Sequence, residues 1–158
     1  DIICGDVDTQ WAMGYFFAIR KSLTDKWNIR WDENLTSYAY AEDLDFSYTY
    51  FKRAKAEGLR CILSERVKVA HLGSQEWRVQ SYKSTAMYVI NREYLSYKHF
   101  ETPVSRLATR WTNFGEFIFR IVKIGNPLDI IQAQLNCDKN RSSIKHQIIL
   151  PGFYEKRR

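Results

Sequence analysis

Cysteine, proline and glycine are all scarce in this chain of 158 residues, which holds three, three and seven of them. The cysteines, Cys4, Cys61 and Cys137, lie far apart, are odd in number and form no C-x-x-C pair. This pattern argues against a disulfide framework or a cysteine-rich zinc site and favours a reducing compartment. Because glycine and proline are few and no repeat is present, extended disorder is not expected away from the ends.

Long apolar runs and a recognisable start are also missing. No run reaches transmembrane length, and no signal peptide is visible. The chain opens on DIICGD rather than on an initiator methionine, so we expect it to be a piece of a longer protein. Hydrophobic residues make up 45% of the chain, which is enough to build a core.

The positive charge is confined to one part of the sequence. Residues 1–102 contain equal numbers of basic and acidic side chains, whereas residues 103–158 hold the entire net charge of +6. A shift of this kind predicts a boundary at Pro103, with a body at 1–102 and a basic, aromatic helical extension with a loose tail at 103–158.

The basic extension supports two interpretations. Arg106, Arg110, Arg120 and Lys123 accompany Trp111 and several phenylalanines. The segment is either a helical hairpin with a solvated basic face or a peripheral contact with an anionic membrane. Nucleic acid is not an expected partner, because the basic residues match no known nucleic-acid-binding signature.

Apolar periodicity predicts the main elements. Helices are expected over 42–57, ended by Gly58, over 79–100, over 104–123, and briefly after Asn126-Pro127. The predicted inward stripes are Leu107, Trp111, Phe114, Ile118 and Ile121 in the third helix, and Leu128, Ile131 and Leu135 in the fourth. Alternation predicts strands at 59–63 and 66–71, and the pattern fades after Cys137.

The stretch AYAEDLDF places three carboxylates, Glu42, Asp43 and Asp45, at a helix start. Negative charge in a first turn stabilises a helix, so the cluster has an ordinary structural explanation. His71, at the end of a predicted strand, is likewise explained as a packed strand-end residue, and Trp77 as a packing residue. None of these signals is specific on its own.

Taken together, four stretches resemble the acceptor side of the family-2 glycosyltransferases of the GT-A type. They are MGYFFAIRKSL (13–23), WDENLTSYAYAEDLDFSYTYFKRAKAEGLRCIL (31–63), VKVAHLGS (67–74) and INREYLSYKHF (90–100). The resemblance covers about residues 7–100. It implies an α/β fold: a partial, Rossmann-like GT-A glycosyltransferase domain with a helical C-terminal extension.

The resemblance also implies a reaction and a set of site residues. Family members transfer a sugar, with inversion, from a nucleotide-diphosphate sugar to an acceptor hydroxyl of a glycan or a lipid-linked glycan. Asp43 would be the general base and Glu42 would orient the site. Asp45 and Trp77 would contact the acceptor, and His71 would be a late ligand of a divalent metal, Mn²⁺ or Mg²⁺.

The family's donor-binding half, which ends in an Asp-x-Asp metal motif, has no counterpart in the sequence. Asp6 and Asp8 form a D-x-D, but it lies only 35 residues before Asp43 and precedes the Gly14 segment directly. We therefore do not interpret it as the metal motif, and expect this chain to be inactive alone. We expect the complete enzyme in the cytoplasm, at the inner face of the membrane. The alternative is a non-catalytic binding or scaffold module.

Overall fold

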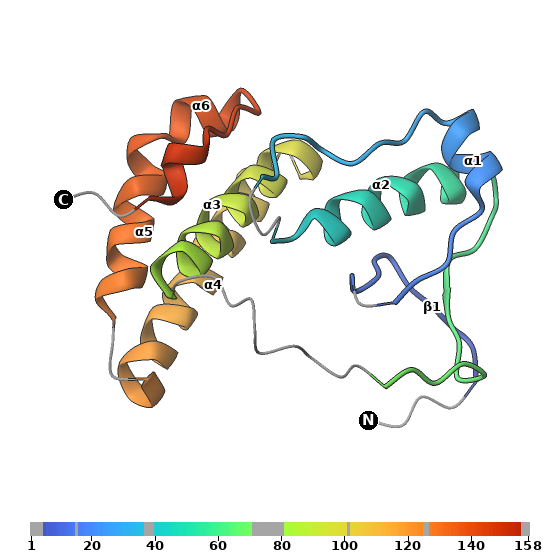
Figure 1. The fold of residues 1–158 in the computed structure, drawn as a ribbon, viewed down its shortest axis with the longest axis horizontal. Coiled ribbons are helices and arrows are strands. Elements are labelled where there is room, and N and C mark those ends of the chain that lie inside the picture. Colours follow the sequence, from blue (N-terminus) through green and yellow to red (C-terminus); the bar gives the residue numbers. More distant parts are fainter. Residues whose placement is uncertain are drawn as a thin grey trace. The chain divides into compact units, whose positions relative to one another are not determined.

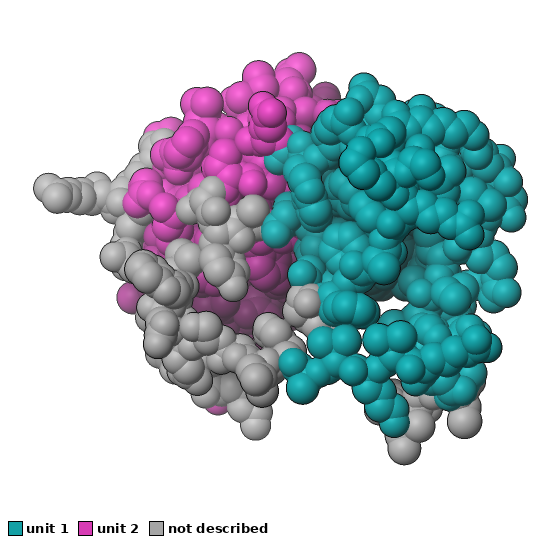
Figure 2. Space-filling view, turned by 45° about the vertical axis from the view of Figure 1, so that its right-hand side comes forward, with its two compact units in different colours: residues 1–32, 42–77 teal, residues 33–41, 78–158 magenta. Residues whose placement is uncertain are grey.

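The computed structural model describes residues 5–14, 16–36, 40–70, 81–100, 102–124 and 127–155. The chain forms two compact units, coloured separately in Figure 2: unit 1 comprises residues 1–32 and 42–77, and unit 2 comprises residues 33–41 and 78–158. This division differs from the boundary expected at Pro103, because the helix before Pro103 packs with the helices after it. The functional division into 1–102 and 103–158 stays a prediction.

Unit 1 is organised around α2 (Glu42–Ala56), preceded by the short α1 (Lys21–Lys26). The first turn of α2 is acidic and its last turn contains Arg53 and Lys55, so its charges complement the helix dipole at both ends. Gly58 ends the helix in a left-handed conformation (φ 71°) that favours glycine. The predicted helix over 42–57, with its glycine stop, is confirmed.

Two strands of two residues each, β1 (Val7–Asp8) and β2 (Ile62–Leu63), pair antiparallel in unit 1, with Val7 opposite Leu63. The expected α/β, Rossmann-like GT-A fold is therefore wrong: helices dominate the described residues, which contain no parallel sheet. The alternating segment at 66–70 pairs with no other strand among the residues described, and Val67 and Val69 are exposed. An alternating apolar pattern does not by itself form a strand where no neighbouring strand supplies hydrogen bonds.

Aromatic side chains pack the inner side of α2. The ring of Phe46 stacks on Trp31 with 4.3 Å between ring centroids and lies 6.3 Å from Phe17. At the other end of the helix, the indole N–H of Trp27 donates to Glu57 at 2.8 Å. Unit 1 therefore has a small aromatic core that fixes residues 17–31 against α2.

Unit 2 is a helical assembly built on α3 (Ser81–His99), which contacts all its other helices. These are α4 (Pro103–Phe119), continued by the π-helical turn η1 (Arg120–Ile124), then α5 (Leu128–Lys139), α6 (Arg141–Lys145) and the 3₁₀ turn η2 (Pro151–Tyr154) (Figure 1). Thr102 caps α4 through a bond from the Ser105 amide, and Pro103 takes the first helical position. The predicted helix over 79–100 is confirmed.

Several apolar residues between 144 and 154 belong to the core of unit 2. Ile144, Ile149, Phe153 and Tyr154 are buried. The phenol of Tyr154 donates to the Asn91 side chain on α3 at 2.7 Å, and the Asn91 amide donates to the Tyr40 carbonyl at 2.7 Å. The expected loose tail after Cys137 is therefore wrong over the described residues, because isolated apolar side chains without periodicity are buried by α3 and α5.

The apolar stripes of α4 and α5 do not face the core. Leu107 and Trp111 on α4 are 69% and 72% exposed, and Leu128 and Leu135 on α5 are 62% and 63% exposed. Instead, α5 buries Ile130, Ala133 and Cys137, together with Asp129 and Asn136. The predicted inward stripes, listed above for both helices, are therefore wrong in orientation, although both helices form.

Glu93 is an ionisable side chain enclosed by the core of unit 2. It is 1% exposed, neither of its carboxylate oxygens has a hydrogen-bond partner in the described structure, and the Arg141 Nε lies 3.9 Å away. Burial raises the pKa of the Glu93 carboxyl. The cations of Arg141, Arg110 and Arg106 oppose this shift and Asp138 adds to it.

We expect a pH-dependent stability that Glu93→Gln removes. The pKa of Glu93 is higher in the folded chain than in the unfolded chain. The protonated carboxyl therefore contributes fully to the free energy of unfolding below the unfolded pKa of about 4.3, and this contribution is lost as pH rises through the folded pKa. Urea unfolding between acidic and neutral pH checks this. The wild-type chain should lose unfolding free energy relative to Glu93→Gln as pH rises, whereas parallel curves would contradict the burial of a titrating Glu93.

Candidate functional site

The Asp43 carboxylate is held by two backbone amides from segments far apart in sequence. Its Oδ2 accepts from the Gly14 N–H at 2.6 Å, across a separation of 29 residues, and its Oδ1 accepts from the Leu44 N–H at 2.8 Å. The side chain remains partly accessible. Charge-assisted bonds to both oxygens fix the orientation of the carboxylate, as required of a group that must meet a substrate hydroxyl.

The segment before α1 reaches Asp43 because it runs along α2. The Ala12 amide donates to the Ser47 hydroxyl at 2.9 Å, one helical turn from the Gly14 contact. At Gly14 a Cβ would lie 3.2 Å from the Asp43 Oδ2 and 3.3 Å from its Cβ, so a side chain there would press on the carboxylate. The glycine of the MGYFF motif thus permits the close approach of backbone to acid.

Glu42 lies beside Asp43 at the start of α2 and is half-buried. Burial raises the pKa of the Glu42 carboxyl, and the negative charge of Asp43 raises it further. A bond from its own backbone amide partly opposes this shift. The residue before this pair, Ala41, is buried with φ of 74°, a left-handed conformation that is costly for a residue with a side chain.

Of the other predicted site residues, only Asp45 lies in the described part of the chain. Asp45 is 3% exposed, so its carboxylate lies inside unit 1 while Glu42 and Asp43 remain partly accessible. His71 and Trp77 lie outside the described residues. The acceptor contacts of Asp45 and Trp77 and the metal-ligand role of His71 therefore stay predictions.

The described part of the chain contains no ligand set for the metal that the resemblance implies. No three His, Cys, Asp or Glu side chains there gather closely enough to hold an ion. Asp8 pairs with Arg60 at 2.8 Å, and Asp6 accepts from the Ser64 hydroxyl at 2.6 Å. These contacts tie both acids of the D-x-D to residues that flank β2.

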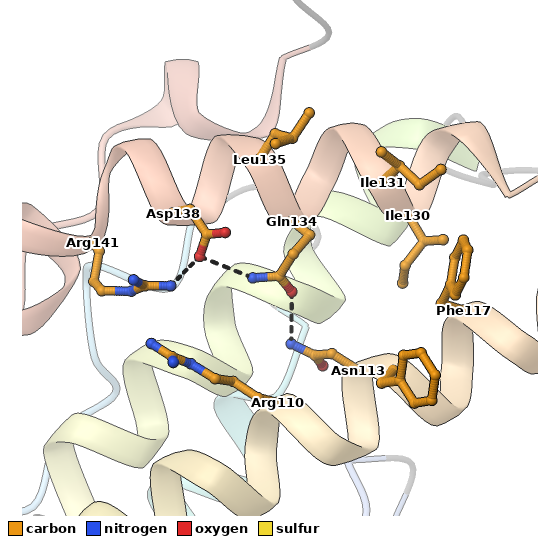
Figure 3. Close-up of a pocket in the computed structure, with 10 residues that line it drawn as sticks. Arg110, Asn113, Phe117, Ile130, Ile131, Gln134, Leu135, Asp138 and Arg141 are labelled. Atoms are coloured by element: carbon orange, nitrogen blue, oxygen red, sulfur yellow. Dashed lines mark hydrogen bonds and ion pairs between the residues drawn. The ribbon is translucent and has the colours of Figure 1, made fainter.

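A second feature, a pocket of about 430 Å³, lies between α4 and α5 in unit 2. Phe117, Ile130 and Ile131 lie at one end of it, and the guanidinium groups of Arg110 and Arg141 at the other (Figure 3). The pocket thus joins an apolar wall to a cationic end.

A chain of hydrogen bonds crosses this pocket. Arg141 donates to Asp138, Asp138 accepts from the Gln134 amide at 3.2 Å, and the Gln134 carbonyl accepts from Asn113 at 3.2 Å (Figure 3). Asn113 is 4% exposed, and its side-chain oxygen has no partner in the described structure.

Sequence reasoning did not find the pocket. Two of its polar members, Gln134 and Asp138, are four residues apart on α5, a helical spacing that places them on one side of the helix, and Arg141 follows as the first residue of α6. That spacing was a usable signal. The contribution of Asn113 was not readable, since it depends on how α4 packs against α5.

No family model, curated protein or solved structure matches this chain.

Proposed function

We propose that this chain carries the acceptor-activating part of an inverting glycosyltransferase, with Asp43 as the general base. The observation that carries the proposal is the fixed Asp43 carboxylate, held through one oxygen by the Gly14 amide and through the other by the Leu44 amide. It is joined by the resemblance of residues 13–23 and 31–63 to the family, in which the second acid of this pair takes the same role.

The chemistry assigned to this carboxylate is one proton transfer. The acceptor O–H bond breaks, its proton passes to Asp43, and the oxygen attacks the anomeric carbon of the sugar. The bond from that carbon to the diphosphate breaks, so that a nucleoside diphosphate leaves and the configuration inverts. Glu42, beside Asp43 at the start of α2, would orient the acceptor through hydrogen bonds to its hydroxyl groups.

An exposed aromatic ring near Asp43 supports the proposal that the acceptor is a sugar. Trp31 is 51% exposed and stacks on Phe46, one helical turn beyond Asp43 on the same face of α2. An aromatic face of this kind offers a flat apolar surface to the C–H face of a sugar ring, while the carboxylates bind hydroxyl groups.

The donor, and with it the divalent metal, belongs in this proposal to a preceding part of a longer protein. We propose a cytoplasmic location for that protein. Among the described residues no helix is long and apolar enough to cross a membrane.

The experiment is a transfer assay with the complete protein. A panel of nucleotide-diphosphate sugars is incubated with glycan and lipid-linked acceptors, and the anomeric configuration of any product is read by NMR. The proposal expects transfer with inversion and release of a nucleoside diphosphate. A complete protein that transfers none of the sugars would support the non-catalytic module instead, and transfer with retention would contradict the inverting reaction assigned to Asp43.

A further inference from the structure

Helix α4 presents its apolar side to solvent. Its exposed stripe repeats every three or four residues, and the fractions exposed are large: Val104 74%, Leu107 69%, Trp111 72%, Ile118 43% and Val122 of the following turn 70%. A continuous row of large apolar side chains in water is costly and marks a surface that another apolar phase covers.

The opposite side of α4 is polar and is held by unit 2. Arg120 donates to the Thr85 hydroxyl on α3 at 2.9 Å and to Glu116 at 2.8 Å. Asn113 donates to Gln134 on α5 at 3.2 Å, and the Arg106 guanidinium lies 5.5 Å from the ring of Tyr97. These contacts fix the rotation of α4, because turning its apolar stripe inward would break them.

The exposed stripe continues onto α5 across the pocket. Phe114 of α4 and Ile131 and Leu135 of α5 line the same pocket and are 51%, 39% and 63% exposed. We call the surface made by the α4 stripe, Phe114, Ile131 and Leu135 the α4–α5 apolar face.

Positive charge borders this face. The guanidinium of Arg110 is exposed at the cationic end of the pocket and forms no ion pair with the residues described. Over residues 103–155, which hold both helices, Lys and Arg outnumber Asp and Glu by seven to four. A second copy of the chain would bring these like charges together, whereas an anionic lipid surface would neutralise them.

We infer that the α4–α5 apolar face docks on the surface of a bilayer that contains anionic phospholipid. α4 lies in the plane of the interface, with Leu107 and Trp111 inserted among the acyl chains and Arg110 at the lipid phosphates. The inference goes beyond the proposed transfer reaction and does not depend on it, since docking needs neither donor nor acceptor.

The test is co-sedimentation of the full chain with vesicles of phosphatidylcholine, alone or with about one third phosphatidylglycerol. At moderate salt, binding to the anionic vesicles should be at least about tenfold stronger than to neutral ones, and added salt should weaken it. Leu107→Ser/Trp111→Ser should weaken binding about tenfold or more, because two apolar side chains no longer enter the interface.

Matched control variants test whether loss of vesicle binding is specific to the α4–α5 apolar face. Trp11→Ser removes another exposed tryptophan, in unit 1, and should leave vesicle binding unchanged. Arg110→Gln should weaken binding to anionic vesicles about fivefold, whereas Arg53→Gln, an exposed arginine on α2, should not. Circular dichroism should be unchanged in all these variants, since the five side chains that they replace are exposed.

Three results would overturn the inference. One is equal binding to neutral and anionic vesicles, or no binding to either. Another is vesicle binding that Leu107→Ser/Trp111→Ser does not alter. The third is self-association of the chain without lipid, if the double variant abolishes it but still binds vesicles. In that case a second copy of the chain, rather than a bilayer, would cover the α4–α5 apolar face.

Discussion

Asp43→Asn should lower the turnover of the complete enzyme by about 10²–10⁴-fold, the usual contribution of a positioned general base. The amide is nearly isosteric with the carboxylate and keeps one oxygen that can accept from Gly14 or Leu44, so the start of α2 should persist. It cannot accept a proton from the acceptor hydroxyl. The affinity for the nucleotide sugar should change little, because the donor is bound elsewhere in the proposed enzyme.

Turnover and donor affinity are measured by steady-state kinetics with saturating acceptor. Asp25→Asn is the matched control: Asp25 is an exposed acid on α1 that pairs with Lys21, and its loss should leave turnover near normal. Near-normal turnover of Asp43→Asn would show that the base assignment is wrong, whatever reaction the enzyme performs.

Tyr154→Ala should lower the free energy of unfolding by about 3–5 kcal/mol, which is typical of deleting a fully buried aromatic ring. Tyr154 is 0% exposed and packs from η2 against α3. The substitution opens a cavity and also removes the donor to the Asn91 side chain. Such a loss is a large part of the stability of a small protein.

Chemical unfolding followed by circular dichroism measures this change. Tyr154→Phe should lose about 1–3 kcal/mol, because only the hydroxyl is removed and the Asn91 oxygen loses its donor. Ile148→Ala, in the same tail but 49% exposed, should stay within about 0.5 kcal/mol of the wild-type chain. If all three variants unfolded alike, the tail would not be part of the core.

Periodicity predicted where the long helices lie but not which side of them is buried. α2 and α3 match their predicted ranges closely, since each combines a strong apolar repeat with end signals such as Gly58. An apolar stripe shows only that one side differs from the other. The hydrogen bonds of Asn113 in α4 and of Arg120 in the following turn η1 attach the polar side to α5 and α3, and no local rule predicts such long-range partners.

Tertiary context also decided the strands and the tail. The alternation of Val67 and Val69 satisfies the pattern of a strand, yet a strand requires a partner that the described part of unit 1 does not supply. In contrast, Phe153 and Tyr154 follow no period but are buried because α3 offers them a surface.

Only the acidic residues of the candidate site could be predicted from the sequence. The cluster at Glu42 and Asp43 marks a helix start from sequence alone, and the structure places both acids in the first turn of α2. The amide of Gly14, 29 residues earlier, could not be inferred as its partner from spacing. The family resemblance included Gly14 in the MGYFF motif but assigned it no contact with Asp43.

The central claim, that the Gly14 amide holds the Asp43 carboxylate in place, is tested most directly by amide NMR of the wild-type chain and of Asp43→Ala. Removing the carboxylate should move the Gly14 and Leu44 amide proton resonances upfield and speed their exchange with water, while Asp25→Ala leaves both unchanged. If the Gly14 amide keeps its shift and its exchange rate in Asp43→Ala, the carboxylate is not held there, and the basis for assigning Asp43 as an oriented base is lost.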